Sequence, residues 1–306
     1  MIYTLTMNPA IDMNICSNEL EAKKVNRTFD AVYTPNGKGL NVSFVLGHFG
    51  VASKIMGFFG GFSGKYIVEA SEEKGFEVAP VWIDDTTRIN VFLNDGSAEY
   101  KLVNEGSFIN EQNKMELLDM IEKAEDMDYL SISGSLPQGI MPDFYDRVFE
   151  ICQKKDVDVI LDISSEKLTD LLKYKPLLIK PNDEEVADIF GLEMKTEKDI
   201  LEALSLLHTK GAQNILLTMG EKGAYFYNEK NVYASTSQPV KLLSSACAGD
   251  SALAAFLSVW LEDRKNVEEA MKLSAATGAN VAESNAIGTL EKVKEYKENI
   301  QVRKVK

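Results

Sequence analysis

After about residue 126 the sequence alternates between short β-rich runs and amphipathic helical patterns, an order that few folds accommodate. The β-rich runs are YLSIS, VDVILDI, LLIK and NILLTM, and the helical patterns are PDFYDRVFEICQKK, EEVADIFG and EKDILEALSLLHTKG. Because a helix that connects two strands of one sheet makes those strands parallel, the alternation predicts a parallel sheet with helices on both faces. The expected fold class is therefore α/β, with three layers.

The first third of the chain adds strands of another kind. Alternating patterns predict strands near residues 11–17, 27–34, 88–93 and 98–103, and Asn94-Asp95-Gly96 predicts a hairpin between the last two. Since these strands cannot all join the parallel sheet, we expect a small β-sheet lid, inserted at about 11–35 and 86–104 of a single domain of residues 1–306. Helices are expected at about 39–49 and 63–75, the second with Ser63 as its N-cap.

The charge and hydropathy of the chain limit the kinds of partner that it is expected to bind. A formal net charge of -14 argues against a nucleic-acid partner, because such proteins present basic faces to the phosphate backbone. The N-terminus lacks a signal-peptide pattern and the longest apolar stretch, ALAAFLSVWL, is too short to span a bilayer, so we expect a cytoplasmic protein with no membrane partner. The cysteines and histidines lack ligand spacing, which indicates neither a disulfide framework nor a zinc site.

The two common phosphate-binding glycine motifs are absent. The candidate Walker A loop at Gly64-Lys65 has Phe59 where the first glycine is required. A Rossmann fingerprint beginning at Gly37 has Val42 where the third glycine is required. These departures disfavour both a P-loop NTPase and a dinucleotide-dependent dehydrogenase.

Two other segments place a charged residue at the start of a predicted helix. In TPNGKGLNVSFVLGHFG, Lys38 lies between two glycines, so it either grips an anion or is a solvated lysine in a turn. In SSACAGDSALAAF, Asp250 lies beside backbone N–H groups of residues 247–250. That carboxylate either complements the helix dipole or accepts a proton from an attacking hydroxyl while the amides stabilise a transferring phosphoryl group.

Both segments, AGDS and NGKGLNVS, resemble the PfkB (ribokinase-like) carbohydrate kinases. Further matches extend the resemblance over nearly the whole chain: TMNPAID (6–12), TRINV (87–91), SGSLPQGI (133–140), LDISSE (161–166), IKPNDEE (179–185), TMGEKGA (218–224) and ESNAIGT (283–289). The opening NPAID and the lysine within GKG are similar to the ketohexose-phosphate branch, the 1-phosphofructokinases and tagatose-6-phosphate kinases. The resemblance implies a ribokinase-like three-layer αβα fold with a mostly parallel central sheet.

The resemblance also implies roles at the reacting end and the sugar end of a site. Asp250 matches the catalytic base, and Cys247, Ala248 and Gly249 match the anion hole for the transferring phosphate. Asp12 matches the carboxylate that holds sugar hydroxyls. The phosphate already on the sugar would be bound by Lys38 and Arg88, with Arg27 as a helper, and the sugar pocket would be shaped by Gly37, Gly39, Asn41, Ser133 and Gly134.

At the nucleotide end, Asn182 and Glu185 match the N-x-x-E element that organises magnesium through its waters. The same spacing is also that of a helix capping box, and both interpretations stay open. The other residues that match nucleotide-binding positions are Lys180, Thr218, Gly220, Gly223, Asn280 and Asn285. ATP and Mg²⁺ are therefore the expected cofactors.

These matches predict an ATP-dependent kinase that converts a ketohexose monophosphate into the 1,6-bisphosphate. Fructose 1-phosphate is favoured because SNAIGT is similar to 1-phosphofructokinases, and tagatose-6-phosphate kinase is the alternative. Four features depart from the family pattern: Cys247 replaces a glycine, Asn36 stands where relatives often have glycine or alanine, Ser165 stands where many have glycine, and NEGSF is shorter than the usual segment. The first departure motivates a second hypothesis, a non-catalytic sugar-phosphate binding protein. A homodimer that pairs through the small sheet is expected in either case.

Overall fold

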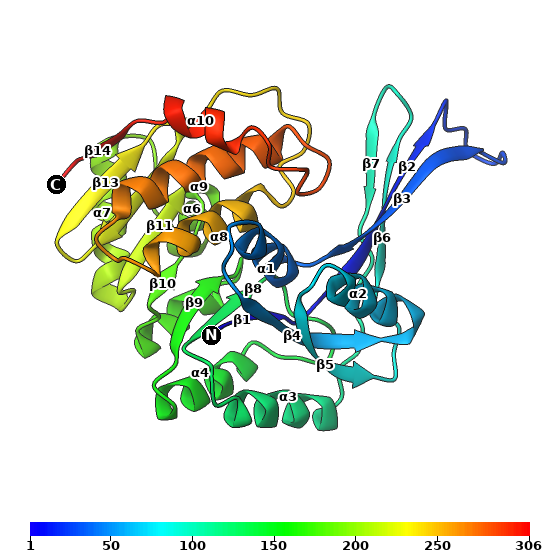
Figure 1. The fold of residues 1–306 in the computed structure, drawn as a ribbon, viewed down its shortest axis with the longest axis horizontal. Coiled ribbons are helices and arrows are strands. Elements are labelled where there is room, and N and C mark those ends of the chain that lie inside the picture. The colour runs from blue at the N-terminus through cyan, green and yellow to red at the C-terminus, as the bar shows by residue number, and fades with distance from the viewer.

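A computed structural model describes residues 1–306 as a large central sheet between two helical layers, with a smaller sheet projecting from one side (Figure 1). The large sheet has ten strands in the order β14-β13-β12-β11-β10-β9-β8-β1-β4-β5. In sequence order they are β1 (Ile2–Thr6), β4 (Ser53–Gly60), β5 (Glu77–Ile83), β8 (Tyr129–Ser133), β9 (Asp158–Asp162), β10 (Leu178–Ile179), β11 (Asn214–Thr218), β12 (Ala224–Asn228), β13 (Asn231–Ser235) and β14 (Val302–Lys304).

The strands from β11 across to β5 pair in parallel, as the alternation of strands and helices predicts. The strands from β12 to β14 instead extend the sheet in antiparallel fashion. The reason is the short connection between β11 and β12, a single 3₁₀ turn at Gly220–Lys222, which reverses the chain without a crossover helix.

Helices cover both faces of the large sheet. One face carries α1 (Lys38–His48), α8 (Ala248–Trp260), α9 (Val267–Ala282) and α10 (Val293–Asn299), whose apolar residues pack with Leu178, Leu216 and Phe226 of the sheet. The other face carries α3 (Glu111–Lys123), α4 (Phe144–Lys154), α5 (Lys167–Leu171), α6 (Asp183–Phe190) and α7 (Glu197–Lys210). The three-layer fold expected from the sequence is confirmed.

The helix α2 (Gly61–Glu73) packs through Ile67 and Val68 beside the N-terminal part of α1. Its N-cap is Gly60, so the expectation that Ser63 caps this helix is wrong. The Ser63 hydroxyl is buried and donates to the Thr87 carbonyl, because the helix already begins two residues earlier. The helix α3 was not expected from the sequence pattern at all.

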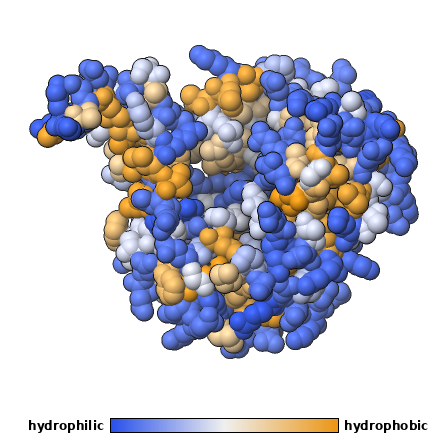
Figure 2. All heavy atoms as spheres, turned by 180° about the vertical axis from the view of Figure 1, so that it is seen from behind, coloured by the Kyte–Doolittle hydropathy of each residue, from blue (hydrophilic) through white to orange (hydrophobic).

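The small sheet has the order β3-β2-β6-β7 and contains β2 (Ala10–Ser17), β3 (Thr28–Asn36), β6 (Ile89–Asn94) and β7 (Glu99–Leu102). All four strands lie where the sequence predicts them. β2 pairs in parallel with β6, while β3 and β7 pair antiparallel at the two open edges. Apolar side chains line this projecting sheet (Figure 2), including Phe29, Val32, Tyr33 and Leu102, which are 45 to 59% exposed.

The topology places one end of the small sheet beside the carboxyl ends of the parallel strands. β1 leads into β2 through residues 7–9, and β3 leads directly into α1. Ligands of open α/β sheets bind outside the carboxyl ends of the strands, so the site is expected at this junction. In the whole structure no helix combines the length and apolar composition that a membrane crossing requires.

Candidate active site

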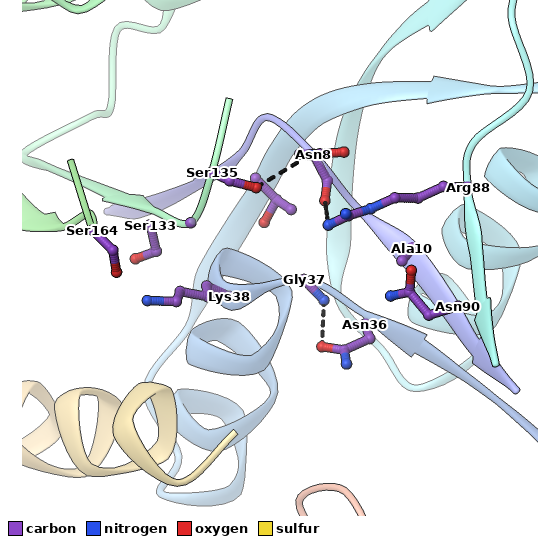
Figure 3. Close-up of a pocket in the computed structure, with 12 residues that line it drawn as sticks. Asn8, Ala10, Asn36, Gly37, Lys38, Arg88, Asn90, Ser133, Ser135 and Ser164 are labelled. Carbon is purple, nitrogen blue, oxygen red and sulfur yellow. Dashed lines mark hydrogen bonds between the residues drawn. The ribbon is translucent and has the colours of Figure 1, made fainter. Parts of the chain in front are cut away.

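A polar pocket lies at the junction between the two sheets (Figure 3). Its volume is about 260 Å³, which suits a small ligand, and only one of its 12 lining residues is hydrophobic. The lining residues are Thr6, Asn8, Ala10, Asn36, Gly37, Lys38, Arg88, Asn90, Ser133, Gly134, Ser135 and Ser164. The hydroxyls of Thr6 and Ser133 are buried without a protein partner, so a polar ligand or water is needed to satisfy them.

Asp12 lies on β2 at the sugar end of the predicted site. The Asn90 amide donates to Asp12 Oδ1 at 2.9 Å, and the Asn36 amide donates to Oδ2. Burial raises the pKa of Asp12, while the two amides and Arg88 oppose that rise. The carboxylate is only 7% exposed and is not among the lining residues, although Asn36 and Asn90 are.

Asp250 lies in the first turn of α8 and is 6% exposed. Its Oδ2 accepts from the Asn41 amide of α1 at 2.9 Å, and no side chain makes an N-cap hydrogen bond to this helix. Burial and the nearby Asp162 carboxylate raise the pKa of Asp250 to about 6, while Lys38, Asn41 and Lys180 oppose that rise. Its place in the first turn still suits the helix dipole, and a pKa of about 6 also makes the group basic enough to accept a proton, so both interpretations stay open.

Cys247 is the N-cap of α8, with φ 64° and ψ -13° in the left-handed region. A residue with a Cβ costs on the order of 1 kcal/mol there relative to glycine. Its thiol accepts from the Asn41 amide at 3.3 Å. Burial, with Asp250 and Asp12 nearby, raises the pKa of this thiol, which therefore behaves as a packed side chain and not as a nucleophile.

A buried carboxylate that the sequence reasoning did not single out, Asp162, lies at the end of β9 between two lysines. Its Oδ1 is 3.1 Å from Lys180 Nζ and 3.4 Å from Lys38 Nζ. Burial alone would raise the pKa of Asp162, but the two lysines outweigh burial and lower it. A Cβ added to Gly249 would lie 3.4 Å from Lys180 Nζ, which places this ammonium group beside the predicted anion hole.

The two cations predicted to bind one phosphate lie on different sides of the pocket. In Figure 3, Lys38 points toward Ser133 and Ser164, whereas Arg88 lies on the far side near Asn8. Burial would lower the pKa of Lys38, but Asp162, Asp250 and Glu185 outweigh burial and raise it. The Lys38 ammonium group is thus held on the side of Asp162 and Asp250.

Arg88 is held in a fixed orientation by backbone carbonyls. Its Nη2 donates to the Asn8 carbonyl at 3.0 Å and its Nη1 to the Asn104 carbonyl at 3.1 Å, while Nε is buried without a partner. Burial lowers the pKa of Arg88 and Asp12 opposes that shift. The guanidinium is therefore positioned in advance, with donors left for an anion.

Asn182 and Glu185 form a complete capping box at the start of α6, so the structural interpretation of this spacing is confirmed. Glu185 also accepts from Ser164 of the pocket lining. Thr218 forms a β-bridge with Asn182, which places the end of β11 beside this helix start. Gly220 and Gly223 have φ of 55° and 95° in the turn after β11, where a side chain on Gly223 would meet the Ser235 carbonyl.

Of the predicted residues, Gly37, Lys38, Arg88, Ser133 and Gly134 line the pocket and the others do not. Three of those others form no hydrogen bond with the site residues described above. Arg27 is exposed in the segment before β3. Asn280 is buried in α9, where its side chain accepts from the Lys292 backbone at 3.1 Å, and Asn285 is exposed in the following turn. The roles of all the predicted site residues stay predictions.

The sequence reasoning missed several polar residues of the pocket lining and its surroundings: Thr6, Asn8, Asn90, Ser135, Asp162 and Ser164. Thr6, Ser133 and Asp162 end the parallel strands β1, β8 and β9, and the others follow such an end or lie in β6. Polar residues at strand ends were thus the available signal.

The structure combines a three-layer α/β fold, a projecting small sheet, a polar pocket between the sheets, and a buried carboxylate at a helix start that is held by Asn41. Asp250 itself does not line that pocket. This combination is that of a ribokinase-like sugar kinase. Residues 2–292 match the family described as pfkB family carbohydrate kinase. The chain belongs to this family.

Relatives of known activity support this assignment. D-tagatose-1-phosphate kinase of Klebsiella oxytoca is 47% identical over 302 residues, 99% of each chain. 1-Phosphofructokinase of Bacillus subtilis (strain 168) is 33% identical over 303 residues, again 99% of each chain. The crystal structure of phosphofructokinase-2 from Escherichia coli in complex with fructose-6-phosphate has a TM-score of 0.88 and 26% identity, covering 97% of this chain and 98% of that one. The chain is therefore a ketohexose phosphate kinase of a family whose sugar kinases use ATP, usually with Mg²⁺.

Proposed function

We propose that the protein transfers the γ-phosphoryl group of ATP to the 6-hydroxyl of a ketohexose 1-phosphate, and that tagatose 1-phosphate is its preferred substrate. The observation that carries the reaction type is the buried Asp250 carboxylate, which Asn41 holds at the start of α8. The segment SNAIGT favoured fructose 1-phosphate. We now favour tagatose 1-phosphate, because the chain is 47% identical to the D-tagatose-1-phosphate kinase and 33% identical to the 1-phosphofructokinase. The two sugars differ only in configuration at C4.

The proposed chemistry is one proton transfer and one displacement. Asp250 accepts the proton of the 6-hydroxyl, the oxygen forms a bond to the γ-phosphorus, and the bond from that phosphorus to the β–γ bridging oxygen breaks to release ADP. Backbone N–H groups of Cys247, Ala248, Gly249 and Asp250 stabilise the charge on the transferring group. Lys180, next to Gly249, and Lys38, held toward the base, add positive charge at the same place.

The sugar end is proposed to lie in the pocket between the sheets. Arg88 binds the 1-phosphate, because its guanidinium is oriented by two carbonyls and retains free donors. Asp12 and its two amides hold ring hydroxyls, and Gly37 and Gly134 form part of the pocket wall around the sugar. Gly39 acts indirectly, because a Cβ there would clash with Thr6 and with the Leu5 backbone, so glycine allows α1 to pack closely on β1 beside the pocket.

The residues present fit a magnesium ion that is held mainly through water. No group of three or more metal-ligating side chains is present, which suits Mg²⁺ because it keeps several waters and uses few carboxylates. The Glu185 carboxylate is oriented by the Asn182 backbone and by Ser164, and it retains lone pairs for metal-bound water. When bound, the ion would neutralise negative charge on the nucleotide phosphates. Thr218, Gly220 and Gly223 would contact the nucleotide from the end of β11.

We also propose a homodimer in which the small sheets of two copies cover each other. The apolar side chains on β3 and the unpaired edge of β7 support this pairing, because exposed apolar edge strands associate readily. Size-exclusion chromatography of Val32→Glu against the unchanged protein tests the pairing. A dimer that becomes a monomer supports it, and an unchanged elution volume contradicts it.

The test of function uses the purified full chain with ATP, Mg²⁺ and each of tagatose 1-phosphate, fructose 1-phosphate and tagatose 6-phosphate, followed by ADP release. We expect the largest kcat/KM with tagatose 1-phosphate. A larger kcat/KM with tagatose 6-phosphate would contradict the proposal that the 6-hydroxyl is the group that is phosphorylated. Thermal stabilisation by the sugars without any ADP release would instead support the sugar-phosphate binding protein that the cysteine at position 247 suggests.

A further inference from the structure

Asn36 ends β3 immediately before α1, and its side-chain amide is bonded at both ends. Oδ1 accepts from the Gly37 backbone at 2.6 Å and from the Asn41 amide at 2.9 Å, while Nδ2 donates to Asp12. A flipped amide would place its N–H group against two donors and its oxygen against a carboxylate. Only one orientation therefore satisfies these partners.

The bond to Asn41 continues this chain of hydrogen bonds to the proposed base. Asn41 Nδ2 donates to both Asn36 Oδ1 and Asp250 Oδ2, each at 2.9 Å. A primary amide has two N–H groups, so these two acceptors define its orientation and leave the Cys247 thiol as a weaker third acceptor. Asp12, Asn41 and Asp250 are all less than 9% exposed, and hydrogen bonds in such surroundings strengthen one another.

We propose that Asn36 is a positioning residue for phosphoryl transfer, which ties the sugar-side carboxylate Asp12 to the base Asp250 through Asn41. One amide then fixes both the carboxylate that seats the sugar and the partner that orients the base. Loss of this amide frees Asn41 to turn away from Asp250. The inference rests on the proposed function for the role of Asp250 as the base.

Asn90 provides a matched control. It donates to the other oxygen of Asp12 at 2.9 Å, and its own oxygen accepts from the Asn104 backbone at 3.2 Å. It makes no hydrogen bond to Asn41 or Asp250. A change at Asn90 therefore disturbs the sugar-side carboxylate alone, whereas a change at Asn36 disturbs both carboxylates.

Changes at Asn36 or Asn90 substitute none of the charged and titratable groups around the two carboxylates. Those that face Asp250 are Asp162, Lys38, Lys180 and Cys247, and those that face Asp12 are Arg88 and Cys247. The Asn41 bond lowers the pKa of Asp250, and the Asn36 and Asn90 bonds lower that of Asp12. Weakening a bond raises the pKa of the carboxylate that accepted it.

The first experiment needs no turnover. Carboxyl signals of ¹³C-aspartate-labelled protein are titrated by NMR in the unchanged protein, Asn36→Ser and Asn90→Ala, with Asp12→Asn and Asp250→Asn to assign the signals. Serine keeps an acceptor for the Gly37 amide but is too short to reach Asn41. We expect Asn36→Ser to raise the Asp250 midpoint by about one pH unit and Asn90→Ala to raise only that of Asp12. An Asp250 midpoint that is unchanged in Asn36→Ser, or equally raised in both, overturns the inference.

Kinetics provide the second measurement. Asn36→Ser should lower kcat about tenfold. It should also shift the acid limb of the pH–kcat profile, where kcat falls with falling pH, to higher pH. Asn90→Ala should mainly raise KM for the sugar phosphate. Equal melting temperatures exclude unfolding, and Asn36→Ala replaces Asn36→Ser if the latter does not fold. An unmoved acid limb in an active variant contradicts the positioning role. If the unchanged protein makes no bisphosphate, the proposed function fails and the NMR titration alone decides the role of Asn36.

Discussion

The two buried carboxylates of the site, Asp12 and Asp250, differ in their surroundings more than in their burial. Burial raises the pKa of both. Asp12 lies on a strand of the small sheet with two neutral amides and Arg88 around it. Asp250 lies at a helix start, where burial and then the charge of a second carboxylate, Asp162, raise its pKa to about 6. A carboxylate held by neutral donors is suited to bind hydroxyls, and one raised toward neutral pH is suited to accept a proton.

Replacing each carboxylate by its amide should separate these roles most strongly. Asp250→Asn should lower kcat by about 10³-fold or more while sparing sugar binding, because the amide cannot accept the proton. Asp12→Asn should instead raise KM for the sugar phosphate with a smaller change in kcat. Steady-state kinetics and calorimetric sugar binding measure both effects. A comparable loss of kcat in the two variants would contradict the different roles proposed for Asp250 and Asp12.

The two cations should differ in the same way. Arg88→Met should raise KM for the sugar phosphate by about 100-fold, because charge-assisted bonds to the resident phosphate are lost. Lys38→Met should mainly lower kcat, because its ammonium group is held toward Asp162 and Asp250. Unchanged KM in Arg88→Met would remove this residue from the phosphate site.

Asp162→Asn should shift the pH dependence of kcat. Asp250 must be ionised to accept a proton, so activity falls as the pH falls through its pKa of about 6. Removing the Asp162 charge removes the repulsion and leaves both lysines, which lowers the pKa of Asp250 and moves the acid limb down by about one pH unit. Asp170→Asn, at an exposed carboxylate that pairs with the largely buried Lys167, is the control and should leave the limb in place. Movement to higher pH would contradict the electrostatic origin of the shift.

The smallest expected effect concerns the backbone beside the base. Cys247→Gly should raise the free energy of unfolding by about 1 kcal/mol or less, since glycine adopts the left-handed conformation without strain but gains freedom in the unfolded chain. Ala286→Gly tests the same relief at φ 51°, in the turn after α9 and outside the pocket. Urea unfolding measures both, and a change in kcat in Cys247→Gly alone would show that the thiol affects the anion hole.

Local patterns predicted much of the fold and part of the site. The four strands of the small sheet were predictable because their alternation and the Asn94-Asp95-Gly96 turn act between neighbours in sequence. The antiparallel pairing of β12 to β14 was not predictable, because pairing at a sheet edge depends on which edge remains open. The helix α3 was missed although a local signal existed, since Asn110 caps it through the Asn113 N–H group. Among site residues, Lys38 and Asp250 stand out beside glycines, whereas Asn90 and Asp162 have no such local mark.

The sequence by itself determined that a lysine stands at the start of one helix and that a carboxylate lies in the first turn of another, since capping residues and glycines act within a few positions. Only the tertiary structure decided that Asn41 meets Asp250 across 209 residues and that Asp162 lies between Lys38 and Lys180. The physical reason is that these contacts follow from the order of strands in the sheet and the packing of α1 against α8. Both depend on burial over the whole molecule, and no short segment encodes that burial.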